Sequence, residues 1–224
     1  MGSLPEDLDR LLHDLRGPLN ALTMHLEVLK RLSRSDLAAL QSLDAIQQEA
    51  VRLAALLPAA FSVMALEPAP LARVDLGVLV RRAAEAAGAG RVSIAEGPWP
   101  EILGDERLLT PAVTHLVRNA LTATEAAGPG RRPPHVSFRP GQPGRVVLIV
   151  RDWGTGLRTT NPRALIRLAL SPKSGRPTLG LVTAERVARL HGGTLTFDSP
   201  SGGGAEVAII LQAATAVRAP GRAS

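Results

Sequence analysis

The chain has 224 residues, 45% of them apolar and 2% aromatic, with no cysteine or tyrosine. This length suits one large domain or two small ones, and the lack of cysteine excludes disulfides and thiol chemistry. Basic residues outnumber acidic ones by 26 to 20, for a net charge of +6, which reflects either a compositional bias or an affinity for anionic partners. The scarcity of aromatic side chains argues against base-stacking nucleic-acid modules. The core must therefore consist of leucine, valine, isoleucine and alanine.

Residues 5–31 are predicted to form one amphipathic helix, because leucines recur with alternating steps of four and three, as in a heptad seam. Ser35 is a candidate N-cap for a second helix over 36–66 with the same spacing. Two such helices joined by a short loop form an antiparallel hairpin, and pairing with a second copy would give a four-helix bundle. We therefore expect a homodimer. The alternative is that both seams pack on the C-terminal part of the chain.

The pattern changes after a proline-punctuated linker at 67–73. Residues 74–212 alternate between helical and strand periodicity, which predicts an α+β domain with helices on one face of a mixed sheet. A short strand or turn is expected at about 74, followed by a helix to about 87. A second helix is entered through Gly104-Asp105, and a third covers 180–190. The expected strands cover 91–96, 135–140, 144–152, 194–199 and 205–212. Residues 158–176 are poorly patterned, and the tail at 213–224 is expected to be disordered.

The chain is expected to be cytoplasmic, without a membrane segment. Its longest apolar run, residues 53–66, is too short to cross a bilayer and contains Pro58. The N-terminus is acidic and lacks the apolar core of a signal peptide.

The stretch "HDLRGPLN" (13–20) contains residues that oppose the helix around it. Pro18 lacks an N–H and its ring clashes with the carbonyl of Asp14, so the helix is expected to bend or open beside His13. His13 points away from the leucine seam, and Asp14 can orient its ring, leaving Nε2 as a nucleophile. An isolated exposed histidine usually has no such role, but a His-Asp pair followed by Gly-Pro is rarer.

This stretch resembles the phosphoacceptor box of sensor histidine kinases of two-component systems. "HLVRNALTAT" resembles their asparagine box, and "DWGTGL" and "TLGLVTAERVARLHGG" resemble their two glycine boxes, in the same order. The resemblance covers about residues 5–212. It implies a dimerisation and phosphotransfer hairpin (1–66), a Bergerat-type ATP-binding domain (74–212), ATP with magnesium, and a response-regulator receiver domain as partner. The implied activity is an ATP-dependent histidine autokinase that phosphorylates His13 and passes the phosphate to a receiver aspartate.

Each motif also has a physical interpretation. The carboxamide of Asn119 suits one ligand of Mg²⁺, and His115, one turn earlier, could support it; by resemblance, Asn119 is the magnesium ligand. Asp152 can accept a hydrogen bond from the adenine amine, and the glycines after it allow close backbone approach. The glycines after Asp152 are Gly154 and Gly156. The helix that begins at Gly180 offers its N-terminal N–H groups to phosphates. Lys173 and Arg176, in the loop before this helix, could pair with the same phosphates.

The chain departs from the family pattern in the second glycine box, where Arg176 and Thr178 stand in two of the three glycine positions. Gly17 replaces the polar residue of phosphatase-competent members. Two alternatives therefore remain open: a histidine phosphotransfer protein with a degenerate ATP site, and a basic scaffold or nucleic-acid protein that uses the fold only for dimerisation. Since only twelve residues precede His13, either the chain is a fragment or an upstream sensor or regulatory protein supplies the signal.

Overall fold

A computed structural model describes residues 14, 15, 17, 18, 20–22, 24, 25, 28, 29, 37–88, 90–157, 159–171 and 175–214. These residues form two compact units. One takes its residues from Met1–Leu66 and Arg167–Val182, and the other from Glu67–Ile166 and Thr183–Ser224. The predicted boundary after residue 66 coincides with a boundary between the units, but the segment 167–182 belongs with the N-terminal unit.

The first unit is built around α2 (Leu37–Met64), which corresponds to the second predicted helix. The described positions between residues 14 and 29 are also helical, Gly17 and Pro18 included. Leu56, Ala60 and Val63 of α2 are buried. Two short antiparallel strands, β6 (Ala169–Leu170) and β7 (Pro177–Thr178), lie against α2. The predicted four-helix bundle needs a second copy, so this single chain does not test it.

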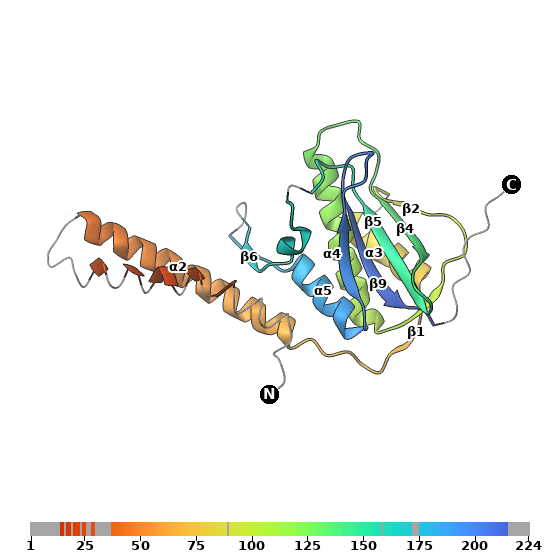
Figure 1. Cartoon of the computed structure of the whole chain (residues 1–224), viewed down its shortest axis with the longest axis horizontal. Coiled ribbons are helices and arrows are strands. Elements are labelled where there is room, and N and C mark those ends of the chain that lie inside the picture. Colours follow the sequence, from red (N-terminus) through yellow and green to blue (C-terminus); the bar gives the residue numbers. More distant parts are fainter. Residues whose placement is uncertain are drawn as a thin grey trace. The chain divides into compact units, whose positions relative to one another are not determined.

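The second unit contains a five-stranded mixed sheet in the order β2-β4-β5-β9-β8 (Figure 1). Its strands are β2 (Ser93–Ile94), β4 (His135–Pro140), β5 (Arg145–Arg151), β9 (Glu206–Gln212) and β8 (Thr194–Asp198). Only the β2–β4 pair is parallel. The strand predicted at 91–96 is observed only as the two residues of β2. The other predicted strands are confirmed.

Helices α3 (Leu76–Gly88) and α4 (Glu106–Ala126) pack on each other and cover one face of the sheet (Figure 1). The face toward them is apolar because alternate strand residues point the same way. Val146, Leu148 and Ile209 on this face are fully buried. A short 3₁₀ helix (Pro162–Leu165) and α5 (Gly180–Leu190) follow β5. The mixed α+β architecture and the aliphatic core are therefore as predicted.

One strand pair was not predicted. β1 (Ala72–Asp75) pairs antiparallel with β3 (Glu101–Gly104). At the other end of the chain, Ala213 bridges to Ile102 and Ala214 donates to the carbonyl of Glu101. Ordered structure therefore continues past the expected start of the tail as far as Ala214, and residues 215–224 lie outside the described residues. Among the helices that are described, none is long and apolar enough to cross a bilayer.

Candidate nucleotide site

Helix α4 presents Asn119 and His115 one turn apart. Asn119 is exposed and His115 is half-buried, while Leu116, Val117 and Ala120 turn into the core. Burial, with a smaller effect of the neighbouring Arg118, lowers the pKa of His115 below its ordinary value. His115 is therefore neutral at pH 7 and can accept or donate a hydrogen bond beside Asn119.

The start of α4 is fixed by Asp105, which is 5% exposed. Its carboxylate caps the helix by accepting from the Arg107 N–H at 3.0 Å, and it also accepts from the Arg107 guanidinium and from the Ala69 N–H at 2.9 Å. The guanidinium and then the Ala69 amide hold the pKa of Asp105 well below its usual range. The Asp105 N–H donates to Nε2 of buried His191 at 2.8 Å, so the C-terminus of α5 is tied to the N-terminus of α4.

The loop after β5 is organised by Asp152, which is 9% exposed. Its Oδ1 accepts from the Gly154 N–H at 2.8 Å and from the Ala205 N–H at 3.1 Å. Its other oxygen, Oδ2, accepts no hydrogen bond from the part of the chain that the structure describes. One oxygen therefore shapes the loop, and the other is left as an acceptor, as an adenine amine requires.

Both glycines of the loop have reasons inside the protein. A Cβ at Gly154 would lie 2.9 Å from the carbonyl oxygen of Ala123, so this glycine lets the loop pack directly on α4. Gly156 has φ +77°, and a Cβ there would meet the Gly204 carbonyl at 3.2 Å. Gly154 thus packs the loop on the backbone of α4, and Gly156 packs it on the backbone of Gly204. The close approach of a ligand to these glycines stays a prediction.

Thr124 and Trp153, two residues that sequence reasoning missed, join this loop to its surroundings. The Trp153 N–H donates to Oγ1 of buried Thr124 at 3.1 Å. The Trp153 ring donates through Nε1 to the Pro133 carbonyl, and the Arg151 guanidinium lies 4.4 Å from its centroid. Thr124 lies little more than one turn after Asn119 on α4. The structure therefore brings the asparagine helix and the Asp152 loop together.

Among the described residues, no group of three or more histidine, cysteine or carboxylate side chains could hold a metal ion by itself. Magnesium does not need one, because it usually keeps several waters and binds phosphate oxygens together with one or two protein ligands. The exposed carboxamide of Asn119 fits a site of this kind, in which nucleotide phosphates complete the shell.

The remaining predicted site residues that are described belong to the first unit. Asp14 Oδ2 accepts from the Leu168 N–H at 3.0 Å. Arg176 is exposed, and its carbonyl accepts from the Ser171 N–H at 2.8 Å in the turn between β6 and β7. Gly180 is the first residue of α5, as predicted. His13 and Lys173 lie outside the described residues.

Residues 104–215, half of the chain, match the family model of the histidine kinase-, DNA gyrase B- and HSP90-like ATPases. The chain belongs to this family. The match begins at Gly104, before the helix that carries Asn119, and it includes the Asp152 loop and α5. The resemblance to sensor histidine kinases inferred from the motifs is therefore confirmed.

Curated relatives of this ATPase-family chain are histidine kinases or regulators. It is 30% identical over 207 residues to the sensor histidine kinase GtrS of Pseudomonas aeruginosa, covering 89% of this chain and 40% of that protein. It is 28% identical to the methanogenesis regulatory histidine kinase FilI of Methanothrix harundinacea and 25% identical to the nitrogen regulation protein NtrY of Azorhizobium caulinodans. The alignments cover 89% and 91% of this chain, but only 23% and 28% of those proteins.

Solved structures give the same fold. The ATP-binding domain of PrrB from Mycobacterium tuberculosis matches 66% of this chain and 100% of that domain, with 25% identity and a TM-score of 0.52. Full-length ShkA in complex with AMPPNP matches 97% of this chain and 47% of that protein, with 26% identity and a TM-score of 0.56. The family ATPase fold therefore accounts for the second unit, and the ShkA match extends over the N-terminal part as well.

Proposed function

We propose that the chain is a dimeric histidine autokinase that transfers the γ-phosphate of ATP to His13 and then to an aspartate of a response-regulator receiver domain. One observation carries the proposal: the Asp152 loop is packed on α4 about one turn after Asn119, through Gly154 and Thr124. An adenine acceptor and a magnesium ligand are thereby held by one rigid core. This arrangement suits phosphoryl transfer, which depends mainly on positioning and charge neutralisation.

In this mechanism Asp152 Oδ2 accepts from the exocyclic amine of adenine. Asn119 would hold magnesium, which would supply positive charge to neutralise the phosphates. The main-chain N–H groups that open α5 at Gly180, together with Lys173 and Arg176, bind phosphate oxygens. His13 Nε2 attacks the γ-phosphorus, the bond to the β-phosphate oxygen breaks, and ADP leaves. Asp14 takes the Nδ1 proton, and its carboxylate has acceptor sites beyond the one that the Leu168 N–H uses.

The proposed homodimer is supported by an apolar stripe on α2 that stays exposed in the described part of the chain. Its members share one face of the helix, which Gln47 interrupts, and they are Leu40, Leu43, Ala50, Ala54, Leu57 and Phe61. Leu43 and Phe61 are 50% and 62% exposed. Such a stripe matches the seam of a helical bundle.

The experiment is incubation with labelled ATP and Mg²⁺, followed by detection of acid-labile, base-stable label on the protein. The label should disappear in His13→Ala and fall at least about tenfold in Asn119→Ala, since the loss of one charge-organising contact costs more than about 1.4 kcal/mol. Gln212→Ala, which removes an exposed carboxamide at the end of β9, is the matched control and should label normally. Labelling that survives in His13→Ala would contradict the proposal.

A second candidate is a phosphotransfer protein whose ATP site no longer works. It is favoured by Thr178, which stands at a glycine position of the family and donates from Oγ1 to the Ala169 carbonyl at 2.9 Å between β7 and β6. Absence of label from ATP, together with transfer to His13 from a phosphorylated receiver domain, would favour this candidate. A wild-type protein with neither activity would contradict both.

A further inference from the structure

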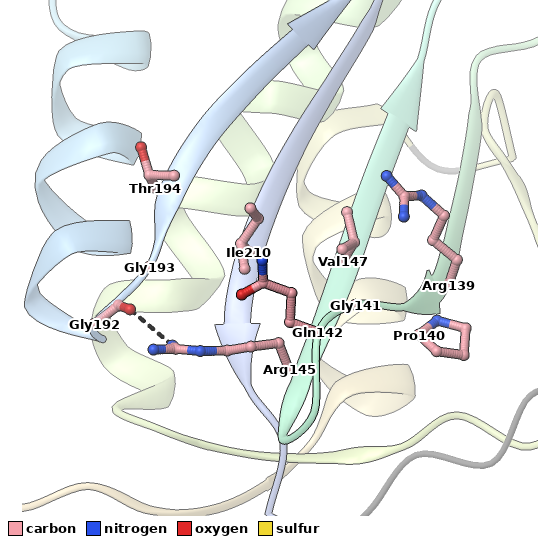
Figure 2. Close-up of a pocket in the computed structure, with 10 residues that line it drawn as sticks. All are labelled: Arg139, Pro140, Gly141, Gln142, Arg145, Val147, Gly192, Gly193, Thr194 and Ile210. Carbon is pink, nitrogen blue, oxygen red and sulfur yellow. Dashed lines mark hydrogen bonds between the residues drawn. The ribbon is translucent and has the colours of Figure 1, made fainter.

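The second unit has a pocket of about 620 Å³ on the sheet face that is turned away from α3 and α4 (Figure 2). Its floor is one row of cross-strand partners. Arg139 of β4 pairs with Val147 of β5, Val147 with Ile210 of β9, and Ile210 with Thr194 of β8. The row therefore has a cationic end, an apolar middle and a hydroxyl at the other end.

The walls add polar groups but no negative charge. Arg145 lies above the floor, and its guanidinium donates to the Gly192 carbonyl at 2.7 Å (Figure 2), which fixes its position. Arg139 is exposed and makes no hydrogen bond or ion pair to any other described residue. Gln142 contributes a carboxamide. No aspartate or glutamate lines the pocket, so two guanidinium groups stand without an internal counter-charge.

The apolar middle of the floor lies on the outer face of the sheet. Val147 is only 4% exposed, and the turn at Gly141 lies close to it, whereas Ile210 is partly exposed. A pocket of this size lies within the range of small-molecule sites, which combine an apolar lining with a few convergent polar groups. A strand from a partner protein would need a free sheet edge, whereas Val147 and Ile210 belong to the interior strands β5 and β9.

The pocket is separate from the candidate nucleotide site. Arg145 begins β5 and Asp152 follows its last residue, so the two sites lie about 20 Å apart along the strand. The pocket also lies on the sheet face opposite α4, which carries Asn119.

We propose that this pocket binds a small amphiphilic anion, in which a phosphate or carboxylate is joined to an apolar group of a few carbons. The anion pairs with the guanidinium group of Arg139, and the apolar group covers Val147 and Ile210, toward the end of the floor where Arg145 is held on Gly192. Both parts are needed, because charge-assisted hydrogen bonds at an exposed site are weakened by water and the apolar floor alone is small.

The test is titration of the ¹⁵N-labelled full chain with hexyl phosphate, followed by NMR through the amides of Gly192, Gly193 and Ile210. These amides should shift saturably. Hexanoate should act on the same amides and report whether a carboxylate suffices. Inorganic phosphate and hexanol, each of which carries half of the ligand, should bind at least about tenfold more weakly.

Arg139→Gln is the decisive variant because the Arg139 guanidinium has no hydrogen-bond or ion-pair partner among the described residues, and the main-chain pairing with Val147 is kept. It should weaken hexyl phosphate binding about tenfold, while Arg131→Gln, an equal loss of charge at an exposed residue outside the pocket, should bind as wild type. The proposal is overturned if the three amides do not respond, if inorganic phosphate or hexanol binds as well as hexyl phosphate, or if both variants lose binding equally. None of these outcomes depends on kinase activity.

Discussion

At the scale of single residues, Asp152 uses one carboxylate oxygen to hold its own loop, and the proposed nucleotide contact falls to the other. Oδ1 accepts two main-chain N–H groups, one of them from Ala205, 53 residues away in the chain. Gly204 makes this possible, because any side chain there would collide with the Asp152 carbonyl, 2.0 Å from the expected Cβ. Sequence analysis identified Asp152 from its motif, but it could not identify Gly204, since the contact that requires this glycine joins distant parts of the chain.

The residue scale also gives a prediction for Asp105. Asp105→Ala should lower the free energy of unfolding by about 1–2 kcal/mol at pH 7, because it removes a helix cap together with its other donors. The folded-state pKa is depressed, so this contribution is present above the ordinary value of 3.8 and is lost as pH falls below it. Urea unfolding from pH 7 down to about pH 2 should show the gap between variant and wild type closing.

The matched control for Asp105 is Asp75→Ala. Asp75 also caps a helix, by accepting from the Val78 N–H at 2.9 Å, but it is exposed. Its replacement should cost less. The assigned role would be refuted if the two variants lost the same free energy of unfolding. It would also be refuted if the difference between Asp105→Ala and wild type did not change with pH.

At the scale of elements, patterned segments were predicted and unpatterned ones were not. Helix α4 and strands β4, β5, β8 and β9 have clear periodicity and were recognised from it. β3 was missed because its four residues, Glu101–Gly104, are too few to display a period, and its partner residues on β1 lie 26 or more residues earlier. Likewise, nothing in the sequence of 167–182 indicates that this segment packs with α2.

Helix α5 is joined to β8 by the carboxylate of Glu185, which is 0% exposed. Its Oε2 accepts from the Leu195 N–H at 2.7 Å, and its Oε1 accepts from Arg189 Nε at 2.9 Å. Thr194 Oγ1 also donates to it at 3.3 Å. A buried carboxylate is tolerated only with such partners.

Glu185→Ala should therefore lower the free energy of unfolding by about 2–4 kcal/mol, because it leaves the buried Leu195 N–H without an acceptor. Glu185→Gln retains a carbonyl oxygen and should lose less. The control is Glu85→Ala on α3, which is exposed and should change stability by less than about 0.5 kcal/mol. The measurement is urea unfolding. A free energy of unfolding for Glu185→Ala within about 0.5 kcal/mol of wild type would refute this role.

At the scale of the whole molecule, the exposed stripe on α2 leads to a prediction about assembly. Light scattering should give about twice the chain mass of 23.5 kDa. Leu43→Glu should produce monomers, because a charge in the seam opposes burial that is otherwise worth about 1.5–3 kcal/mol per leucine. Gln48→Glu, at an exposed position off the stripe, is the control and should remain dimeric. A monomeric wild type would contradict the stripe's proposed role.

The hydrogen bond from Leu195 to Glu185 also affects how copies of the molecule can meet. β8 is an edge strand of the sheet. An edge strand exposes main-chain N–H groups that can pair with a strand of another molecule and so start aggregation. Here the donor in the second residue of β8 is already occupied by a buried negative charge. An incoming strand could not use that donor, so one of the positions at which this edge of the sheet could be extended is closed.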